Sequence, residues 1–144
     1  MIVHAGLVAR RLGGLWLGAL IEGPSGAGKS DLTLRLLDLG FRLVADDRVV
    51  LWAAEGRLYG RAPDVLAGLI EVRGQAVASE PALPLAEVAL VLHPGSPERM
   101  PDPQARDLLG VAVPHLTLAY VEASAPAKLR RAMDALYVAR QRRM

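Results

Sequence analysis

The alternation of apolar and polar residues along the chain predicts a fold with many strands and few helices. Leucines at helical spacing predict a helix from Ser30 to about Leu39. The residues around Ser124 are typical of a helix start and predict a second helix that runs to about Arg142. Short apolar runs predict strands, and the strands at residues 69–72 and 88–92 are expected to be buried. The expected strands span residues 2–9, 15–21, 42–45, 49–52, 57–59, 69–72, 88–92 and 116–121.

The connections between these elements indicate one α/β domain. Gly13–Gly14 and Glu55–Gly56 are expected to turn the chain between neighbouring strands, and the proline-rich segment 93–103 is expected to be a loop. Strands mixed with two helices favour an α/β fold with a mixed, partly antiparallel sheet. The chain has 144 residues, 52% of them hydrophobic, which is enough for a single domain with its own core over residues 1–144.

Composition and charge exclude several classes of protein. No apolar run approaches the ~20 residues that a membrane-spanning helix needs, and the start of the chain lacks the charged leader of a signal peptide. There are no cysteines, which excludes disulfides and thiolate metal sites and agrees with a cytoplasmic protein. The net charge of +2 is too small to indicate binding to nucleic acid.

Basic residues are concentrated at the end of the chain. From Lys128 to Arg143 there are six basic residues and one acid, Asp134. Two interpretations stay open: a solvated helix that keeps the protein soluble, or a surface that steers an acidic protein partner toward the molecule. Because Arg140, Arg142 and Arg143 lie at the very end, their removal is not expected to disturb the core.

The segment 23–30 matches the phosphate-binding loop (P-loop) pattern G-x-x-x-x-G-K-[ST] at every fixed position. Glycines let successive N–H groups point at one phosphate, and the following helix N-terminus adds a partial positive charge. Lys29 is expected to reach the β- and γ-phosphates of a nucleotide, and the Ser30 hydroxyl is expected to hold Mg²⁺. The expected nucleotide-binding residues are Gly23, Pro24, Ser25, Gly26, Ala27, Gly28, Lys29 and Ser30.

Two carboxylates end the next expected strand. The apolar residues 43–45 are followed by Asp46 and Asp47, so one helix and one strand separate this acidic pair from the loop. In a β-α-β unit such a strand lies beside the loop strand, and its C-terminal end faces the phosphates. One carboxylate can then serve the metal while the other takes the proton of an attacking hydroxyl. Their repulsion is expected to raise the pKa of one of them, and the alternative is a solvated turn.

Four segments, in this order along the chain, resemble the catalytic domain of the HPr kinase/phosphorylase family, which is more distantly similar to phosphoenolpyruvate carboxykinases. The resemblance covers roughly residues 2–75. It implies a P-loop kinase domain that uses ATP and Mg²⁺ to phosphorylate a serine of HPr, a phosphocarrier of the bacterial phosphotransferase system. The matching segments are Val3–Val8, Gly23–Ser30, Leu43–Val49 and Leu69–Gly74.

The resemblance also implies roles for individual residues. His4 takes the place of the family's catalytic histidine, as a partner of the acidic pair or of a phosphate. Glu71 takes the place of its Mg²⁺ ligand, and Arg73 that of an arginine that supports catalysis. The family's base lies in the acidic pair, where Asp47 is favoured over Asp46, and Asp47 is also a candidate Mg²⁺ ligand. The alternatives are a structural histidine at His4 and a half-buried ion pair between Glu71 and Arg73.

Other residues leave alternatives open. Arg99 is a candidate for a mobile arginine that stabilises the transferring phosphate, and Arg106 competes for that role; the alternative is a solvated loop arginine. His93 and His115 are interpreted as structural. A small-molecule P-loop kinase and a non-catalytic nucleotide-binding switch remain alternative functions.

The resemblance has limits in the second half of the chain. The segment that the family's phosphorylase reaction depends on has no clear counterpart in residues 118–123. The separate N-terminal domain of full-length members is also missing from the sequence. These departures resemble a truncated, kinase-type member with doubtful phosphorylase activity. The family typically forms hexamers, so a homo-oligomer is possible here.

Overall fold

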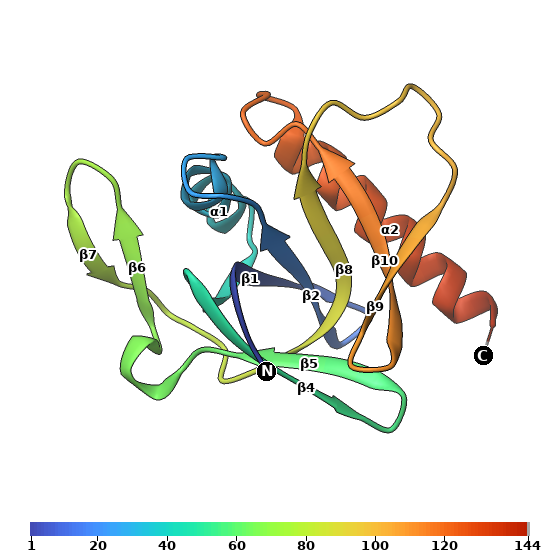
Figure 1. Ribbon diagram of the computed structural model, residues 1–144, viewed down its shortest axis with the longest axis horizontal. Helices are drawn as coiled ribbons and strands as arrows, with labels where there is room; N and C mark the ends of the chain where they lie inside the picture. The colour runs from blue at the N-terminus through green and yellow to red at the C-terminus, as the bar shows by residue number, and fades with distance from the viewer. Residues whose placement is uncertain (144) are drawn as a thin grey trace.

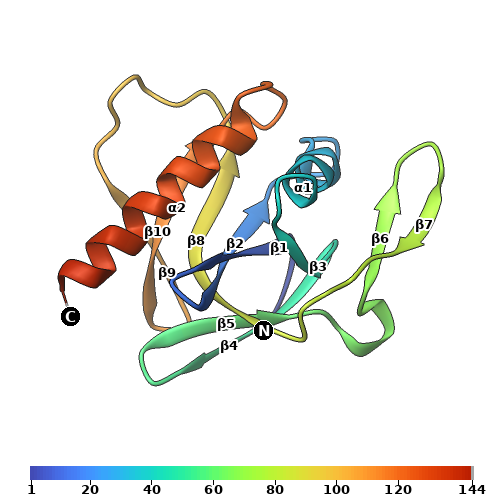
Figure 2. The same ribbon diagram turned by 180° about the vertical axis from the view of Figure 1, so that it is seen from behind.

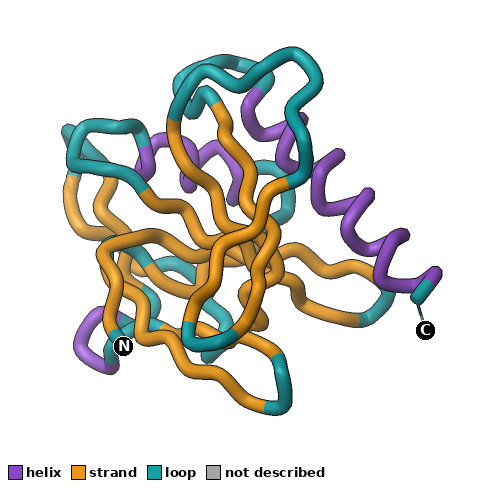
Figure 3. The backbone as a smooth tube through the Cα atoms, turned by 45° about the vertical axis from the view of Figure 1, so that its right-hand side comes forward, coloured by secondary structure: helices purple, strands orange, loops and turns teal. Residues whose placement is uncertain are grey.

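The computed structural model describes residues 1–143, in which strands predominate (Figure 3). The strands are β1 (Ile2–Leu12), β2 (Leu15–Glu22), β3 (Arg42–Ala45), β4 (Arg48–Ala54), β5 (Arg57–Arg61), β6 (Leu69–Val72), β7 (Ala76–Ser79), β8 (Ala86–Pro94), β9 (Gln104–Leu108) and β10 (Val111–Leu118). The helices are α1 (Lys29–Leu37) and α2 (Ala125–Arg142), and Asp64–Leu66 forms a short 3-10 turn. Within residues 1–143, neither α-helix is long and apolar enough to cross a bilayer.

Eight strands form one sheet that returns on itself. The order is β2-β1-β4-β5-β8-β10-β9, and β3 pairs with β1 beside this path. Strand β8 also pairs with β2, so that β2, β1, β4, β5 and β8 form a closed circuit of hydrogen-bonded strands. Strand β1 is antiparallel to β2, β3 and β4, whereas β8 runs parallel to β2 and β10. The predicted α/β fold with a mixed sheet is therefore confirmed.

Strand alternation divides the buried residues into two apolar clusters. Along β1, Leu7 belongs to one cluster and the neighbouring Val8 to the other, because successive side chains point to opposite faces of a sheet. The first cluster is built almost wholly from strand residues and lies on the inner face of the closed circuit. The second packs under both helices and includes Leu36 of α1 and Met133 of α2. The two helices therefore cover the outer face (Figure 2).

Both predicted helices are present. Helix α1 spans Lys29–Leu37, where residues 30–39 were expected, and Gly40 beyond it has a φ of 91° that favours glycine. Helix α2 has Ser124 at its N-cap and a proline in its first turn, as expected, although the Ser124 side chain makes no capping hydrogen bond. The segment predicted to form a β-hairpin around Glu55–Gly56 does so as β4 and β5.

The segment 69–72 forms a strand with the expected bounds but lies outside the main sheet. Strands β6 and β7 pair only with each other and stand apart from the rest of the molecule (Figures 1 and 2). In β6 only Ile70 is buried, and Val77 of β7 is 64% exposed. The prediction of a buried strand is therefore wrong, because a two-stranded hairpin covers few of its own side chains. Strand β7 itself was not predicted.

Two further expectations fail for reasons of topology. Strand β3 does not lie beside the loop strand β2, because β1 pairs between them. Both are antiparallel to β1, so they run parallel to each other and their C-terminal ends still reach the same side of the sheet. The last strand is Val111–Leu118, where residues 116–121 were expected, and it forms a hairpin with the unpredicted β9. Leu109 and Gly110 turn this hairpin, both at positive φ.

The end of α2 is tied to the start of β8. Arg140 donates to both carboxylate oxygens of Glu87, at 3.0 and 2.6 Å, and Arg57 donates to the same carboxylate at 3.0 Å. Burial disfavours the charge of Glu87, but the two guanidinium groups outweigh it and lower the pKa of this carboxyl. The expectation that removing Arg140 leaves the core undisturbed is wrong, because Arg140 compensates a carboxylate that is only 12% exposed.

Candidate functional site

A cavity of about 610 Å³ lies where the loop before α1 meets the ends of β1 and β3 and the β6–β7 hairpin. Most of the residues singled out from the sequence lie in its wall, although they come from widely separated parts of the chain. These are His4, Ser25, Gly26, Gly28, Lys29, Ser30, Asp46, Asp47, Glu71 and Arg73. Gly23, Pro24 and Ala27 complete the loop 23–30, here called the glycine loop, without lining the cavity.

The glycine loop curls through backbone conformations that favour glycine. Gly26 and Gly28 have φ values of 85° and 98°, and Gly28 is the N-cap of α1. The Lys29 ammonium folds back over the loop and donates to the carbonyl oxygens of Gly23, at 2.6 Å, and Pro24, at 3.1 Å. The first N–H groups of α1 have no partners within the helix, so this end of the cavity favours an anion.

Asp46 is bonded to the β6–β7 hairpin. Its Oδ2 accepts a hydrogen bond from the backbone N–H of Glu71 at 2.9 Å, which joins β6 to the end of β3 and helps to place Glu71 and Arg73 in the cavity wall. Burial raises the pKa of Asp46; the N–H of Glu71 opposes the rise, and repulsion from Asp47 and Glu71 adds to it. The expected rise within the acidic pair thus falls on Asp46, with burial as its main cause.

Asp47 faces the first strand instead. Its Oδ1 and the Nε2 of His4 form a short hydrogen bond, and the two side chains are 56% and 59% exposed. Asp47 has a φ of 71°, a left-handed conformation that aspartate adopts more readily than most residues. Its carbonyl accepts a hydrogen bond from the N–H of Ala5 at 3.0 Å. The backbone of Asp47 is therefore fixed while its carboxylate stays open to solvent.

Several residues of the cavity wall were not predicted from the sequence. Thr33 is 1% exposed, and its hydroxyl donates to the carbonyl of Lys29 at 2.8 Å. Arg35 pairs with Asp31 at 3.0 Å and also donates to two carbonyls of the segment after β10, which brings Val121 to the glycine loop. The position of Thr33 one helical turn after Lys29 was a usable signal. Val121 gave none, because it lies far along the chain. The missed residues are Gly6, Asp31, Thr33, Leu34 and Val121.

The two arginines considered for a mobile loop lie in different environments. Arg99 is exposed in the loop between β8 and β9 and does not line the cavity. Arg106, on β9, forms an ion pair with Glu22 and contacts the Nε2 of His115 at 3.1 Å. Burial, followed by repulsion from Arg106, lowers the pKa of His115. Arg106 is thus held by partners on the sheet, whereas Arg99 remains the loop residue.

A match to a family of known proteins covers every residue of this cavity wall except Val121. Residues 4–79, more than half of the chain, match the HPr Serine kinase C-terminal domain. The chain belongs to this family. The matched range contains every residue predicted for the site except Arg99.

Curated HPr kinase/phosphorylases are also similar to this chain. That of Clostridium tetani is 48% identical over 67 residues, which is 46% of this chain and 22% of the relative. That of Clostridium botulinum, strain Eklund 17B, is 34% identical over 116 residues, which is 71% of this chain and 38% of the relative. The chain therefore spans well under half the length of these curated relatives.

One solved structure extends the likeness to nearly the whole chain. The Hpr(Ser) kinase/phosphatase from Coxiella burnetii superposes with a TM-score of 0.80, over 98% of this chain and 99% of that one. The sequence identity is 23%, so this likeness shows the fold alone. It includes β8, β9, β10 and α2, which lie beyond the family match.

Proposed function

We propose that this chain is an ATP- and Mg²⁺-dependent protein kinase that phosphorylates a serine of the phosphocarrier protein HPr. The observation that carries the proposal is one cavity in which the glycine loop, the acidic pair and the end of β6 meet. Membership of the HPr kinase family supports the same activity, as do the names of the curated relatives. We further infer that the glycine loop is a P-loop in a domain similar to phosphoenolpyruvate carboxykinase.

The residues present fit a magnesium nucleotide. A cavity of about 610 Å³ is of ordinary size for a small-molecule ligand. The Lys29 ammonium can exchange its loop carbonyls for phosphate oxygens, because the carbonyls that it contacts belong to the same loop. Ser30, Glu71 and Asp47 offer oxygen ligands, the type that Mg²⁺ prefers. When bound, this ion neutralises phosphate charge and orients the transferring group.

The acceptor chemistry is assigned to Asp47 with His4 beside it. The serine hydroxyl attacks the γ-phosphorus, its proton moves to the Asp47 carboxylate, and the bond from the γ-phosphorus to the leaving ADP oxygen breaks. His4 orients this carboxylate through their hydrogen bond. Asp46 is less suited to the role, because it is partly buried and bonded to the backbone of β6, whereas the side chain of Asp47 is 56% exposed and open to an acceptor. Arg73 in the wall, and Arg99 from the loop, are proposed to stabilise charge on the transferring phosphate.

The direct test is incubation of the purified chain with ATP, Mg²⁺ and HPr, followed by the intact mass of HPr and mapping of the modified residue. We expect one added phosphate on a serine, dependent on Mg²⁺. Lys29→Met, which keeps most of the apolar side chain but removes the ammonium, is the matched control and is expected to form product at least about a hundredfold more slowly. An unmodified HPr with a folded, ATP-binding chain would contradict the proposal.

The alternatives give different outcomes in the same experiment. A small-molecule kinase would consume ATP with a metabolite acceptor and leave HPr unmodified, and a nucleotide-binding switch would bind ATP without transfer. The reverse reaction, in which phosphate attacks phospho-HPr and releases pyrophosphate, is expected to be weak or absent.

A further inference from the structure

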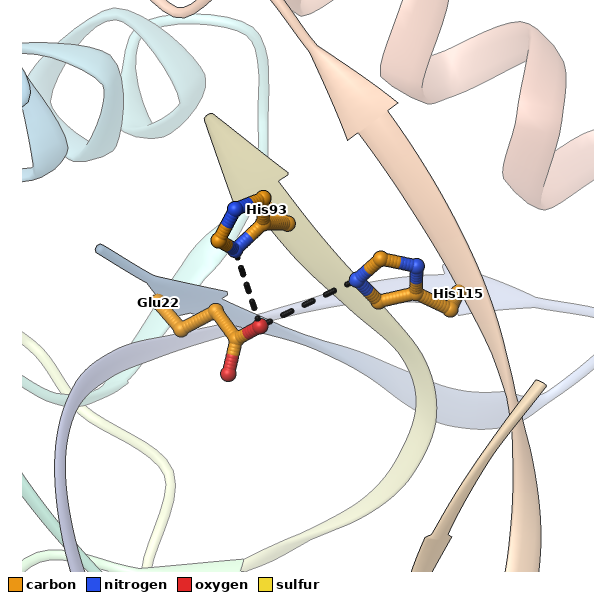
Figure 4. Close-up of side chains that lie close together, drawn as sticks. All are labelled: Glu22, His93 and His115. Carbon is orange, nitrogen blue, oxygen red and sulfur yellow. Dashed lines mark hydrogen bonds and ion pairs between the residues drawn. The ribbon is translucent and has the colours of Figure 1, made fainter. Parts of the chain in front are cut away.

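A second group of polar side chains lies outside this cavity, beside the start of the glycine loop. Glu22, His93 and His115 come from β2, β8 and β10, which are neighbouring parallel strands, and their side chains point toward one another (Figure 4). Alternation explains the arrangement, since each residue stands two positions beyond a buried residue of the inner cluster and so shares its face. Those buried residues are Leu20, Val91 and Val113.

The atoms of this trio are already near the spacing that a metal ion requires. The Oε1 of Glu22 lies 3.3 Å from the Nδ1 of His93 and 3.8 Å from the Nε2 of His115. All three ligand atoms lie within 4.8 Å of one another. Tetrahedral coordination with bonds of 2.0–2.1 Å places ligand atoms about 3.4 Å apart. Small side-chain rotations would therefore close the trio around an ion. Within residues 1–143 it is the one such group of three.

The two oxygens of Glu22 are divided between different partners. Oε1 faces the two imidazoles, whereas Oε2 accepts from Nη1 of Arg106. Arg106 Nη2 also contacts the Nε2 of His115, at 3.1 Å. Because a guanidinium only donates, this ring nitrogen accepts and carries the lone pair that a metal needs. Arg106 is therefore a cation that must release His115 before a metal ion binds.

The backbone around the trio is fixed, and one side is open to solvent. The carbonyl of Glu22 accepts a hydrogen bond from the hydroxyl of Tyr120 at 2.7 Å, and Glu22 pairs with Ala5 of β1. The His93 side chain is 49% exposed, against 14% for His115. An ion can therefore enter from the solvent beside His93 and bind Glu22 and His115, which are held on paired strands.

We propose that Glu22, His93 and His115 bind a divalent transition-metal ion of the zinc class, with water completing the coordination. Two imidazoles and one carboxylate suit Zn²⁺, Co²⁺ or Ni²⁺, whereas Mg²⁺ prefers oxygen ligands alone. The site is distinct from the oxygen-rich set proposed for Mg²⁺. Since Glu22 directly precedes Gly23, a bound ion would brace the strand that leads into the glycine loop against β8 and β10.

The test is calorimetric titration of the whole chain with Zn²⁺ in excess Mg²⁺, with visible absorption of Co²⁺ as a second readout. We expect one high-affinity Zn²⁺ per chain and a rise in the melting temperature when it binds. His93→Gln should weaken binding by at least the roughly 10- to 100-fold that changes around metal ligands cost. Its side chain is half exposed, so the variant is expected to fold, and His115→Gln is the second variant.

Two control variants separate this site from the cavity. His4→Gln removes the imidazole beside Asp47 and should leave the affinity for Zn²⁺ unchanged. Arg106→Gln removes a competing cation and should tighten binding. The proposal is overturned if the native chain binds no Zn²⁺, if His93→Gln and His115→Gln bind it as the native chain does, or if His4→Gln is the variant that abolishes binding.

Discussion

Replacing Asp47 by Asn tests the proposed chemistry most directly, because the structure separates this side chain from the fold. The Asn side chain keeps the size of Asp and retains an oxygen for His4, but it cannot take a proton at neutral pH. Both side chains of the His4–Asp47 pair are more than half exposed. Exposed ion pairs contribute about 0–1 kcal/mol to stability, so Asp47→Asn should leave the melting temperature nearly unchanged.

The expected effect on the rate is much larger than the effect on stability. Loss of a positioned general base lowers rates by about 10²- to 10⁴-fold, which corresponds to roughly 3–5 kcal/mol in the activation free energy. The nucleotide site should largely survive, since the Lys29 ammonium contacts carbonyls of the glycine loop and not Asp47, and the Asn side chain keeps an oxygen that can face Mg²⁺. We therefore expect kcat to fall by two to four orders of magnitude while the Kd for ATP stays close to that of the native chain.

A double-mutant cycle with His4→Gln tests whether the histidine acts through Asp47. Transfer to HPr is followed by intact mass under single-turnover conditions, and the Kd for a fluorescent ATP analogue is measured in parallel. If His4 only orients the carboxylate, His4→Gln should lower kcat in the native background and have no further effect beside Asp47→Asn. Unchanged turnover in a folded Asp47→Asn chain would refute the assignment of the base. Additive effects would refute the coupling of the pair.

Four other perturbations follow from the contacts described. Lys29→Met should lower kcat for transfer about a hundredfold or more, ~3 kcal/mol, and activity near that of the native chain would exclude the P-loop role. Glu71→Gln should weaken nucleotide binding with Mg²⁺ more than without it, and equal losses in calorimetry would favour an ion pair with Arg73. Glu87→Gln should destabilise the fold by about 1–2 kcal/mol at pH 7, because two guanidinium groups lose their charged partner. The pKa of Glu87 is lowered from 4.5 in the folded chain, so the charged carboxylate stabilises the fold above pH 4.5 and less so as the pH falls below it. The difference in denaturant midpoint between the native chain and Glu87→Gln should therefore shrink as the pH is lowered below 4.5, and a constant difference would contradict the ion-pair account. Removal of residues 141–144, which keeps Arg140, should raise the KM for HPr at low salt without changing the melting temperature, and an unaltered KM would leave the tail as a solubility device.

The parts of the site that are built from contiguous residues could be predicted from the sequence. The glycine loop and α1 are contiguous, so a strand, a loop and a helix could be inferred from one stretch of residues. The end of β3 also followed from its apolar run and the acidic pair after it. In each case the signal lay within a few residues of the element that it predicted, and family resemblance supplied His4 and Glu71.

The remaining features depend on pairings between distant segments. Nothing in the residues of β2 and β3 shows that β1 lies between them, and the separate β6–β7 sheet places Glu71 through a backbone bond to Asp46. His93 and His115 were interpreted as structural because each was expected at the end of a strand or loop. Only the parallel pairing of β8 with β2 and β10 brings them to Glu22.

Because the circuit of strands is closed, the stretch of chain that carries the proposed site is shorter than the stretch that the fold needs. Residues 4–79 hold nearly every residue assigned to catalysis, but β2 and β5 both pair with β8, which begins only at Ala86. A fragment cut at residue 79 would expose two unpaired strand edges, which are templates for aggregation. Ile21, two residues before the glycine loop, pairs with Leu92. During synthesis, β2 therefore cannot pair with β8 until about two thirds of these 144 residues have been translated.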